Sequence, residues 1–471
     1  MSTDPELSDL DPTDLGPTDL DPVGPALTGP LARECEYITY FPVNIRPFTP
    51  ADLTARPTDG SAGFGIYLHV PLCDQICPFC NYNKFLSGTH PDRLGGLLEQ
   101  EIALYGNVVA PHVDRADFVY FGGGTPSVLS AARVGSLLAR LGERFDLEAA
   151  EVCLECHPAH ATAEYLTALR EAGVNRISFG VQSFDARMLT AIGSHHTADD
   201  SAACVPAARR AGFDNVAIDL MFLLPGQDMD SWSADLDRAV RTGADHISTY
   251  RMLLDPMGPL GRGIRLGRTV PQAGEETEVR MAQTALDTLA VAGYRHYGSC
   301  SSAGFDLCLP GRESVYELRH RAAPQCEYAA IGPGAVGFLN GSVYWNIHTL
   351  GEYARTVAGG APPVLAGRTL TDSDRRSRYA VLGVKHLELP LAPFRERFGR
   401  TLREAFPDTL DLLAAGGLTE ESGEALRITP RGVHYMDTIS KAFFNADNHR
   451  FPQPYKPELQ LMSVDLHGSP A

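Results

Sequence analysis

Three cysteines that lie close together in the sequence have the type and spacing of metal ligands. Cys73, Cys77 and Cys80 form the pattern C-x3-C-x2-C directly after an apolar run typical of a strand. Three thiolates on one loop can bind three irons of a cubane [4Fe–4S] cluster and leave the fourth iron open. A zinc site or buried thiols are the alternatives, but zinc takes four ligands and the next candidates are His69 and His90. The spacing therefore predicts a [4Fe–4S] cluster with one open coordination position.

Polar residues interrupt apolar runs further along the chain. Glu155, Gln182 and Asp219 each stand within a run that is typical of a buried strand. Burying a charge without a partner is costly, so Glu155 in particular needs a partner from a ligand or from the chain. The alternative is a set of core polar groups satisfied by their neighbours. Residues 122–125, Gly-Gly-Gly-Thr, let the backbone approach a ligand closely, although a tight turn would also prefer glycine.

These residues need a scaffold that brings them to one edge. Short apolar runs alternate with longer amphipathic segments, which predicts repeated βα units and a parallel sheet. The predicted strands are 65–70, 118–122, 152–157, 176–181, 216–223 and 246–252, and the predicted helices include 92–106, 131–145 and 231–243. Ligands of parallel barrels bind at the carboxyl ends of the strands, where the motifs fall. The expected fold class is α/β, a partial parallel (βα)6-type barrel with a small, mostly helical C-terminal domain.

The pattern changes at both ends of this core. The first 30 residues contain seven acidic residues, six prolines and no Lys or Arg, which predicts a disordered acidic tail. Residues 331–345 are typical of a Gly-rich hairpin, and residues 426–439 of a strand, a turn and a helix. The expected division is 1–30 acidic tail, 31–63 N-terminal extension, 64–300 barrel core, 301–369 hairpin and connecting region, 370–445 helical or winged-helix-like domain, and 446–471 tail.

Composition excludes several classes of function. The 471 residues carry a net charge of −18, so the chain is a poor general binder of nucleic acid or of anionic lipid. No apolar run approaches the roughly 20 residues of a membrane span, and no secretory signal pattern is present. We expect a cytoplasmic protein without a nucleic-acid or membrane partner.

The cysteine pattern and its surroundings resemble the radical S-adenosylmethionine (SAM) superfamily. Within it, the chain is similar to a subgroup that holds oxygen-independent coproporphyrinogen III oxidase, the related heme chaperone and the oxidase-like class C radical SAM methyltransferases. The resemblance covers roughly residues 60–445 and rests on several ordered motifs: YLHVP, FGGGTPS, ECHP, GVNRISFGVQSFD, GFDNVAIDLMFLLPGQ and YWN. In this superfamily SAM binds the open iron, and its reductive cleavage gives a 5′-deoxyadenosyl radical that abstracts a hydrogen atom. The implied cofactors are therefore a [4Fe–4S] cluster and SAM.

The oxidase and its methyltransferase relatives resemble each other in holding two SAM molecules. Matching this chain to the family motifs assigns residues to both sites. The first SAM site corresponds to Tyr67, Gly123 and Glu155, and the second corresponds to Phe79, Gly124, Thr125, Gln182 and Asp219.

The chain departs from the family patterns at informative positions. The oxidase pattern has a fourth cysteine where this chain has Tyr82, which weakens the oxidase assignment. The chaperone motif HNxxYW is reduced to a stretch that retains only His320. An arginine that pairs with a SAM carboxylate is replaced by Ser194, and a hydroxyl cannot supply its bidentate contact. The candidates for a substitute are Arg251, His195 and His196.

The departures at Tyr82 and in the chaperone motif favour methyl or methylene transfer as the first hypothesis, whereas Ser194 argues against it because it removes an expected carboxylate anchor. One SAM would give the radical, and the other would donate a carbon to an sp2 carbon of a natural product, by C-methylation or cyclopropanation. The alternatives are oxygen-independent coproporphyrinogen III oxidation and heme delivery. The resemblance implies a small-molecule substrate and an electron donor such as flavodoxin or ferredoxin, and transfer chemistry allows a partner methyltransferase or carrier.

Overall fold

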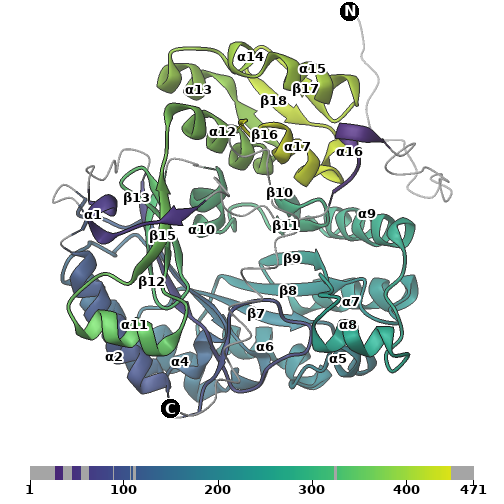
Figure 1. The fold of residues 1–471 in the computed structure, drawn as a ribbon. Helices are drawn as coiled ribbons and strands as arrows, with labels where there is room; N and C mark the ends of the chain where they lie inside the picture. Colours follow the sequence, from purple (N-terminus) through teal and green to yellow (C-terminus); the bar gives the residue numbers. More distant parts are fainter. Residues whose placement is uncertain are drawn as a thin grey trace, which may run out of the picture.

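A computed structural model describes most of the chain (Figure 1). The described residues are 27–34, 45–54, 63–88, 90–106, 108–109, 113–322 and 326–446. The predicted acidic tail, apart from its last four residues, lies outside them, as does almost all of the predicted tail from residue 446.

All six predicted strands are present, and they form the parallel centre of a 13-stranded sheet. Most residues of these strands are buried, as expected of parallel strands covered on both faces, although the last strand, residues 246–251, contains His, Ser, Thr and Arg. In sheet order they are β2 (Phe64–Val70), β5 (Phe118–Gly123), β6 (Glu151–Cys156), β7 (Arg176–Gln182), β8 (Val216–Phe222) and β9 (His246–Arg251). All five pairings between these neighbours are parallel, so their carboxyl ends meet at one edge.

Helices connect these strands along the outer side of the sheet (Figure 1). The main ones are α2 (Pro91–Tyr105), α3 (Ala131–Gly142), α4 (Ala163–Glu171), α6 (Ala198–Arg210), α7 (Met229–Thr242) and α9 (Glu275–Val291). Several begin at a side chain that accepts a backbone N–H of the first turn: Ser130, Thr162, Thr197 and Asp228. Such N-caps fix where each crossover helix begins, and so where each strand end lies.

Antiparallel strands extend the sheet on both flanks. One flank continues from β2 through parallel β12 (Glu327–Ile331) to β13 (Val336–Leu339), β14 (Ser342–Asn346), β15 (Val364–Thr369) and β1 (Arg46–Pro47), and the other adds β11 (Gly304–Cys308) and β10 (Arg295–Ser301). The predicted hairpin is β13–β14, which turns at Asn340 and Gly341, both with positive φ. The strand order is linear, so within the described residues the sheet does not close into a full barrel.

The C-terminal part has its own small sheet and its own apolar core. Strands β16 (Glu388–Pro390), β17 (Thr419–Glu421) and β18 (Ala425–Ile428) pack with α12 (Asp372–Gly383), α13 (Leu391–Phe398), α15 (Pro407–Ala415) and α17 (Met436–Ala442). It meets the main sheet where Ser302 and Asp437 exchange hydrogen bonds of 3.0 and 2.9 Å. The predicted fold class is confirmed as a largely parallel α/β sheet with a mostly helical C-terminal part; the predicted domain boundaries stay a prediction.

No helix among the described residues is long and apolar enough to span a bilayer.

Candidate functional site

The three cysteines lie on a loop that the chain closes at its base. Strand β3 (Leu72–Cys73) pairs with β4 (Phe85–Leu86), and we name residues 73–84 the cysteine loop. Lys84 Nζ donates to the Cys80 carbonyl at 2.7 Å, which ties the end of the loop to its middle. All three cysteines are free and half-buried. The fold therefore presents three thiols on one short, internally braced segment.

These thiols fit a cubane cluster better than a single ion. Burial raises the pKa of Cys77 to about 11, and the neighbouring charges of Cys80 and Cys73 raise it further. Burial also raises the pKa of Cys73, and the Thr125 hydroxyl opposes that rise. Among the described side chains, no three His, Cys, Asp or Glu converge on a point where one ion could be bound. A cubane fits this arrangement because each thiolate binds a different iron.

The glycine run packs at the end of β5 against the start of the cysteine loop. The Gly124 and Thr125 N–H groups donate to the carbonyls of Val70 and Leu72 at 2.9 and 2.8 Å. A Cβ on Gly124 would lie 2.8 Å from the Leu72 oxygen, so no larger residue fits there. Close approach of two chain segments thus already accounts for this glycine. Ligand binding by Gly123, Gly124 and Thr125 stays a prediction.

Glu155 has the partners that its burial requires. The Tyr120 hydroxyl donates to Oε1 at 2.9 Å, and the Gly123 N–H donates to Oε2 at 3.2 Å. Burial raises the pKa of Glu155 to about 7, and these two donors oppose the rise. The carboxylate is therefore held against the glycine run at the carboxyl edge of the sheet.

Gln182 and Asp219 lie at the same edge on the next two strands. Gln182 has a φ of 62°, in the left-handed region, and its Oε1 accepts from the Tyr250 hydroxyl at 2.9 Å. Asp219 makes no hydrogen bond with any described residue. Burial raises the pKa of Asp219 well above its usual range, and the nearby Glu155 carboxylate adds to the shift. A half-buried carboxylate that accepts no hydrogen bond from a described residue and lies near other acids is the arrangement expected of a ligand-binding group.

The two predicted aromatic residues contact different neighbours: Tyr67 lies on β2, and Phe79 lies on the cysteine loop. The Tyr67 hydroxyl is hydrogen-bonded to His69 Nδ1 at 3.2 Å, and its ring lies 6.0 Å from that of Tyr120. Phe79 packs against an apolar cluster that Tyr250, the partner of Gln182, also contacts. The structure thus brings the predicted residues of both sites around one strand edge, but their roles toward SAM stay predictions.

Two tyrosines that hold the acidic and amide groups were missed from the sequence. Tyr120 and Tyr250 supply the hydroxyls that Glu155 and Gln182 accept. A usable signal existed, because alternate residues of a strand share a face and Tyr120 is two residues before Gly122. The pairing itself crosses between strands and is not visible in one segment.

Two of the three residues proposed to replace the missing arginine are hydrogen-bonded to other groups of the chain. Ser194 Oγ is hydrogen-bonded to His196 Nδ1 at 3.0 Å, and His196 Nε2 to the Val181 carbonyl at 2.9 Å. Arg251 Nη1 donates to Glu278 at 2.5 Å. His195 is exposed. Both His196 and Arg251 are therefore held by groups of the chain itself.

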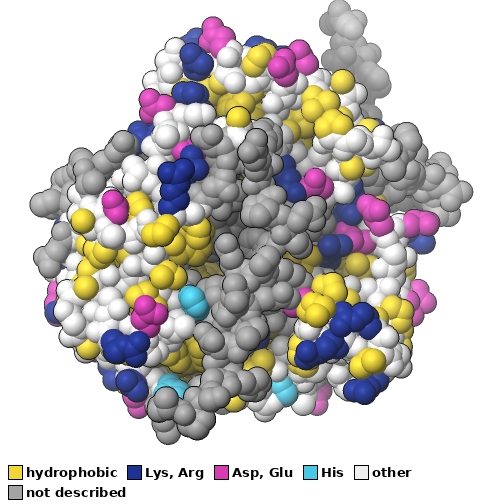
Figure 2. Space-filling view, in the orientation of Figure 1, with side chains coloured by type: hydrophobic (Ala, Val, Ile, Leu, Met, Phe, Trp, Pro, Cys, Tyr) yellow, Lys and Arg dark blue, Asp and Glu magenta, His cyan; other side chains and the backbone are white. Residues whose placement is uncertain are grey.

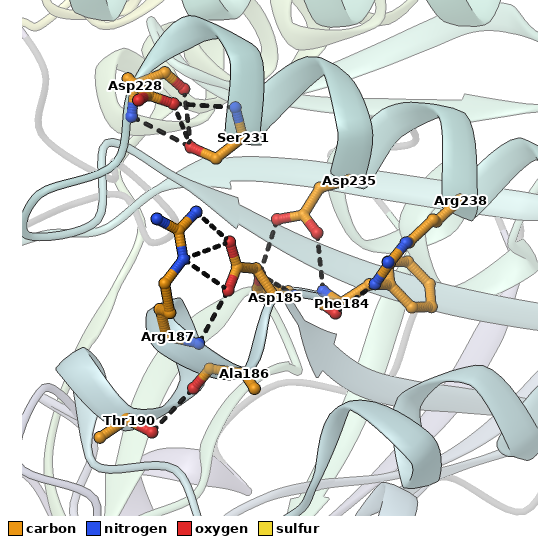
Figure 3. Close-up of polar contacts among 10 residues, drawn as sticks. Phe184, Asp185, Ala186, Arg187, Thr190, Asp228, Ser231, Asp235 and Arg238 are labelled. Carbon is orange, nitrogen blue, oxygen red and sulfur yellow. Dashed lines mark hydrogen bonds and ion pairs between the residues drawn. The ribbon is translucent and has the colours of Figure 1, made fainter.

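Helix α7 holds the segment that follows Gln182 (Figure 3). The Asp235 carboxylate accepts from the Ser183 hydroxyl at 2.6 Å and from the Phe184 N–H at 2.7 Å. One turn later, Arg238 Nη1 donates to the Phe184 carbonyl at 2.6 Å. Both polar groups of Phe184 are thus bound by one helix, and this clamp fixes the backbone next to the left-handed Gln182.

The chain matches known families and proteins over most of its length. The family model of the radical SAM superfamily matches residues 67–239, and that of the HemN C-terminal domain matches residues 370–435. Heme chaperone HemW of Mycobacterium tuberculosis is 32% identical over 398 residues, covering 83% of this chain and 97% of that protein. Oxygen-independent coproporphyrinogen III oxidase of Pseudomonas aeruginosa is 27% identical, covering 88% and 93%. Coproporphyrinogen III oxidase HemN from Escherichia coli has the same fold, with a TM-score of 0.74 at 24% identity, covering 86% of this chain and 96% of that chain.

These matches correct one expectation from the sequence. Methyl or methylene transfer to a natural product is the wrong prediction, because the relatives that match over nearly their whole length are heme chaperones and a coproporphyrinogen III oxidase. The match of residues 370–435 to the HemN C-terminal domain points the same way. The error came from the weight placed on Tyr82, which is an exposed side chain.

Proposed function

Because this chain belongs to the radical SAM superfamily, in the subgroup of oxygen-independent coproporphyrinogen III oxidase and heme chaperone HemW, we propose that it oxidises a tetrapyrrole substrate. Its cofactors are a [4Fe–4S] cluster and SAM, and the predicted recognition of this subgroup is confirmed. When bound, the two cofactors together supply a carbon radical that removes a hydrogen atom from the substrate. The rest of the proposal concerns what the chain's own residues do.

One observation carries the proposal: the carboxyl ends of neighbouring strands bring Glu155, Gln182 and Asp219 beside the cysteine loop. Asp219 lacks a hydrogen bond from any described residue, so a ligand with a donor group would lower the cost of burying it. The SAM ammonium and ribose hydroxyls are such donors. Phe79 packs against an apolar cluster on this side of the edge.

We assign the two SAM positions as the sequence predicted. The residues of the first position are Tyr67, Gly123 and Glu155, and those of the second are Phe79, Gly124, Thr125, Gln182 and Asp219. The three thiols at Cys73, Cys77 and Cys80 are the cluster ligands. A small-molecule substrate and a reductant complete the set of partners.

The proposed reaction converts a propionate side chain into a vinyl group. Removing one hydrogen atom from the propionate, together with CO2 and one electron, leaves the carbon–carbon double bond. Bound SAM would supply the acceptor of this hydrogen atom, and an external one-electron acceptor would take the electron. An oxidation of this kind agrees with the name of the Pseudomonas aeruginosa relative, oxygen-independent coproporphyrinogen III oxidase.

A specific observation favours heme delivery as the second candidate, because HemW relatives match at 30–32% identity over almost their full length. The histidine retained from the chaperone motif counts against it. His320 is 3% exposed, its Nε2 is hydrogen-bonded to the Tyr328 hydroxyl at 3.1 Å, and its ring stacks on Tyr316. A side chain held in this way must be released before it can bind heme iron.

The test is anaerobic incubation of reconstituted protein with SAM, dithionite, an added one-electron acceptor and coproporphyrinogen III. Release of CO2 with one 5′-deoxyadenosine per vinyl group formed supports oxidation. The triple variant Cys73→Ala/Cys77→Ala/Cys80→Ala is the control, and it should contain no cluster and form neither product. Tight 1:1 heme binding without CO2 release would favour the chaperone instead.

A further inference from the structure

One short segment next to the site carries positive charge on a strongly acidic chain. Residues 257–270 contain three arginines and no Asp or Glu, whereas the whole chain has a net charge of −18. The segment contains helix α8 (Pro259–Arg265), and dark blue and yellow side chains lie side by side over it in Figure 2. We name this surface the α8 patch; its exposed residues include Met257, Arg262, Arg265, Leu266, Arg268 and Val270.

The positive charge of the α8 patch is not neutralised by the described part of the chain. Arg262 and Arg268 form no ion pair with a described residue, and Arg265 donates to the neutral carbonyl of Pro256. The apolar side chains between them are unusually open, with Leu266 and Val270 each 63% exposed. Exposed apolar groups among uncompensated arginines are typical of a surface that binds a partner.

The α8 patch is joined by direct packing to the cysteine loop. Leu260, a buried residue of α8, belongs to the apolar cluster against which Phe79 packs. Phe79 lies between Cys77 and Cys80 in the sequence. Next to it, Asn81 Nδ2 donates to the Leu253 carbonyl at 3.0 Å, just before the patch. A protein that docks on α8 would therefore stand close to the thiols, which electron transfer requires.

We propose that the α8 patch is the docking surface for a small acidic one-electron carrier protein. This inference rests on the proposed function, which needs one electron for each SAM cleaved. The reduced carrier gives up one electron and leaves oxidised, and that electron breaks the sulfur–carbon bond of SAM. The arginines steer the carrier, and the apolar groups supply the short-range contact of a transient complex.

The positive charge of the α8 patch can attract an acidic carrier although the chain as a whole is acidic. At physiological ionic strength the Debye length is about 8 Å, so distant carboxylates are largely screened. A carrier that approaches α8 experiences mainly Arg262, Arg265 and Arg268. An anionic lipid surface is the rival partner, but α8 has only seven residues, and the position next to the cysteine loop gives a membrane no role.

Binding and turnover are measured with recombinant flavodoxin as the probe. The test variant is Arg262→Glu/Arg265→Glu/Arg268→Glu, and Arg262→Gln/Arg265→Gln/Arg268→Gln repeats it without charge reversal. The matched control reverses three exposed arginines at α13, as Arg395→Glu/Arg397→Glu/Arg400→Glu. Oxidised flavodoxin binding is titrated at low and high salt, and SAM cleavage is driven in parallel by reduced flavodoxin and by dithionite.

The test variant should bind flavodoxin at least about tenfold more weakly and show an equal rise in the KM for flavodoxin. Its dithionite-driven rate should stay within about twofold of wild type, because the small reductant needs no docking. Unchanged flavodoxin binding in both α8 variants would overturn the proposal. So would loss of binding to phosphatidylglycerol vesicles with flavodoxin binding intact. If dithionite drives no SAM cleavage in wild type, the proposed function fails, while the binding titration still decides the docking surface.

Discussion

Two regions of this molecule bury carboxylates, and they treat them differently. Glu101 lies on α2 and is completely buried; the Tyr353 hydroxyl, the Gly332 N–H and the Asn346 side-chain amide all donate to it. At the carboxyl edge of the sheet, Glu155 has two donors and Asp219 has none from the described residues. In the first region, three groups of the chain donate to one carboxylate. In the second region, carboxylate oxygens remain that could still accept a hydrogen bond from a ligand.

The difference shows which signal identifies a ligand site. Burial raises the pKa of Glu101 to about 8 and that of Glu155 to about 7, so a raised pKa does not separate the two regions. Hydrogen bonding does separate them, because a saturated carboxylate has no capacity left for a ligand. We therefore interpret Glu101 as structural: it fixes Gly332, which packs against the His69 backbone beside the site.

The largest expected effect tests the carboxylates at the carboxyl edge of the sheet. Asp219→Asn should lower dithionite-driven SAM cleavage at least about 100-fold, because the amide removes a charge-assisted contact to the ligand. The melting temperature should stay equal or rise, since one of several neighbouring acids is lost. Cleavage is measured as 5′-deoxyadenosine formed, and melting by circular dichroism. A destabilised variant with normal cleavage would reverse the interpretation.

The second-largest expected effect tests Glu101, which has three donors from the chain. Glu101→Ala leaves the buried Gly332 N–H and Tyr353 hydroxyl without the acceptor that they share, and we expect the free energy of unfolding to fall by about 2 kcal/mol. Cleavage per folded molecule should stay within about threefold of wild type. Chemical denaturation gives the stability, and iron content per chain normalises the activity. Lost SAM binding at unchanged stability would make Glu101 part of the site.

Local sequence patterns predicted much of the fold but only part of the candidate site. The six strands could be predicted because strands buried on both faces read as continuous apolar runs. Glu101 could not be recognised as buried, because its partners Asn346 and Tyr353 are 245 and 252 residues away in the sequence. The predicted reaction was wrong because it relied on one substitution, Tyr82, whereas the correction comes from similarity over most of the chain.

A third carboxylate, Asp235, sharpens the comparison because it has two donors, as Glu155 has, and both donors belong to the segment beside the site. Burial raises the pKa of Asp235 to about 6, and its donors, Ser183 and Phe184, directly follow Gln182. Asp235→Ala should raise the KM for SAM about tenfold with a smaller change in kcat, because it loosens the backbone that positions Gln182.

Two variants separate positioning by Asp235 from general damage. Asp235→Asn keeps one acceptor oxygen and should recover part of the SAM affinity. Arg187→Ala removes an exposed ion pair with Asp185 in the same segment and should leave the KM within about twofold. A uniform fall in kcat with unchanged KM in Asp235→Ala would mean that the clamp does not position Gln182.

The smallest expected effect is the pH dependence of stability that Glu101 imposes. Its pKa is about 8 in the folded protein, against a usual value of 4.5 in an unfolded chain. Between these values the folded state holds one proton more than the unfolded state, so the free energy of unfolding falls as pH rises. The stabilisation is fully present below 4.5 and is lost as pH passes through about 8.

Glu101→Gln removes the titrating group and should flatten this fall, which denaturation at a series of pH values measures. The matched control is Glu171→Gln, an exposed acid at the end of α4, which should keep the wild-type slope. A flatter slope would show that the raised pKa of Glu101 affects the stability of the fold, as expected of a structural residue. If the slope of Glu101→Gln equals that of wild type, Glu101 does not carry the extra proton. The saturated region would then hold an ionised acid, and its three donors would act as a charge-stabilising site.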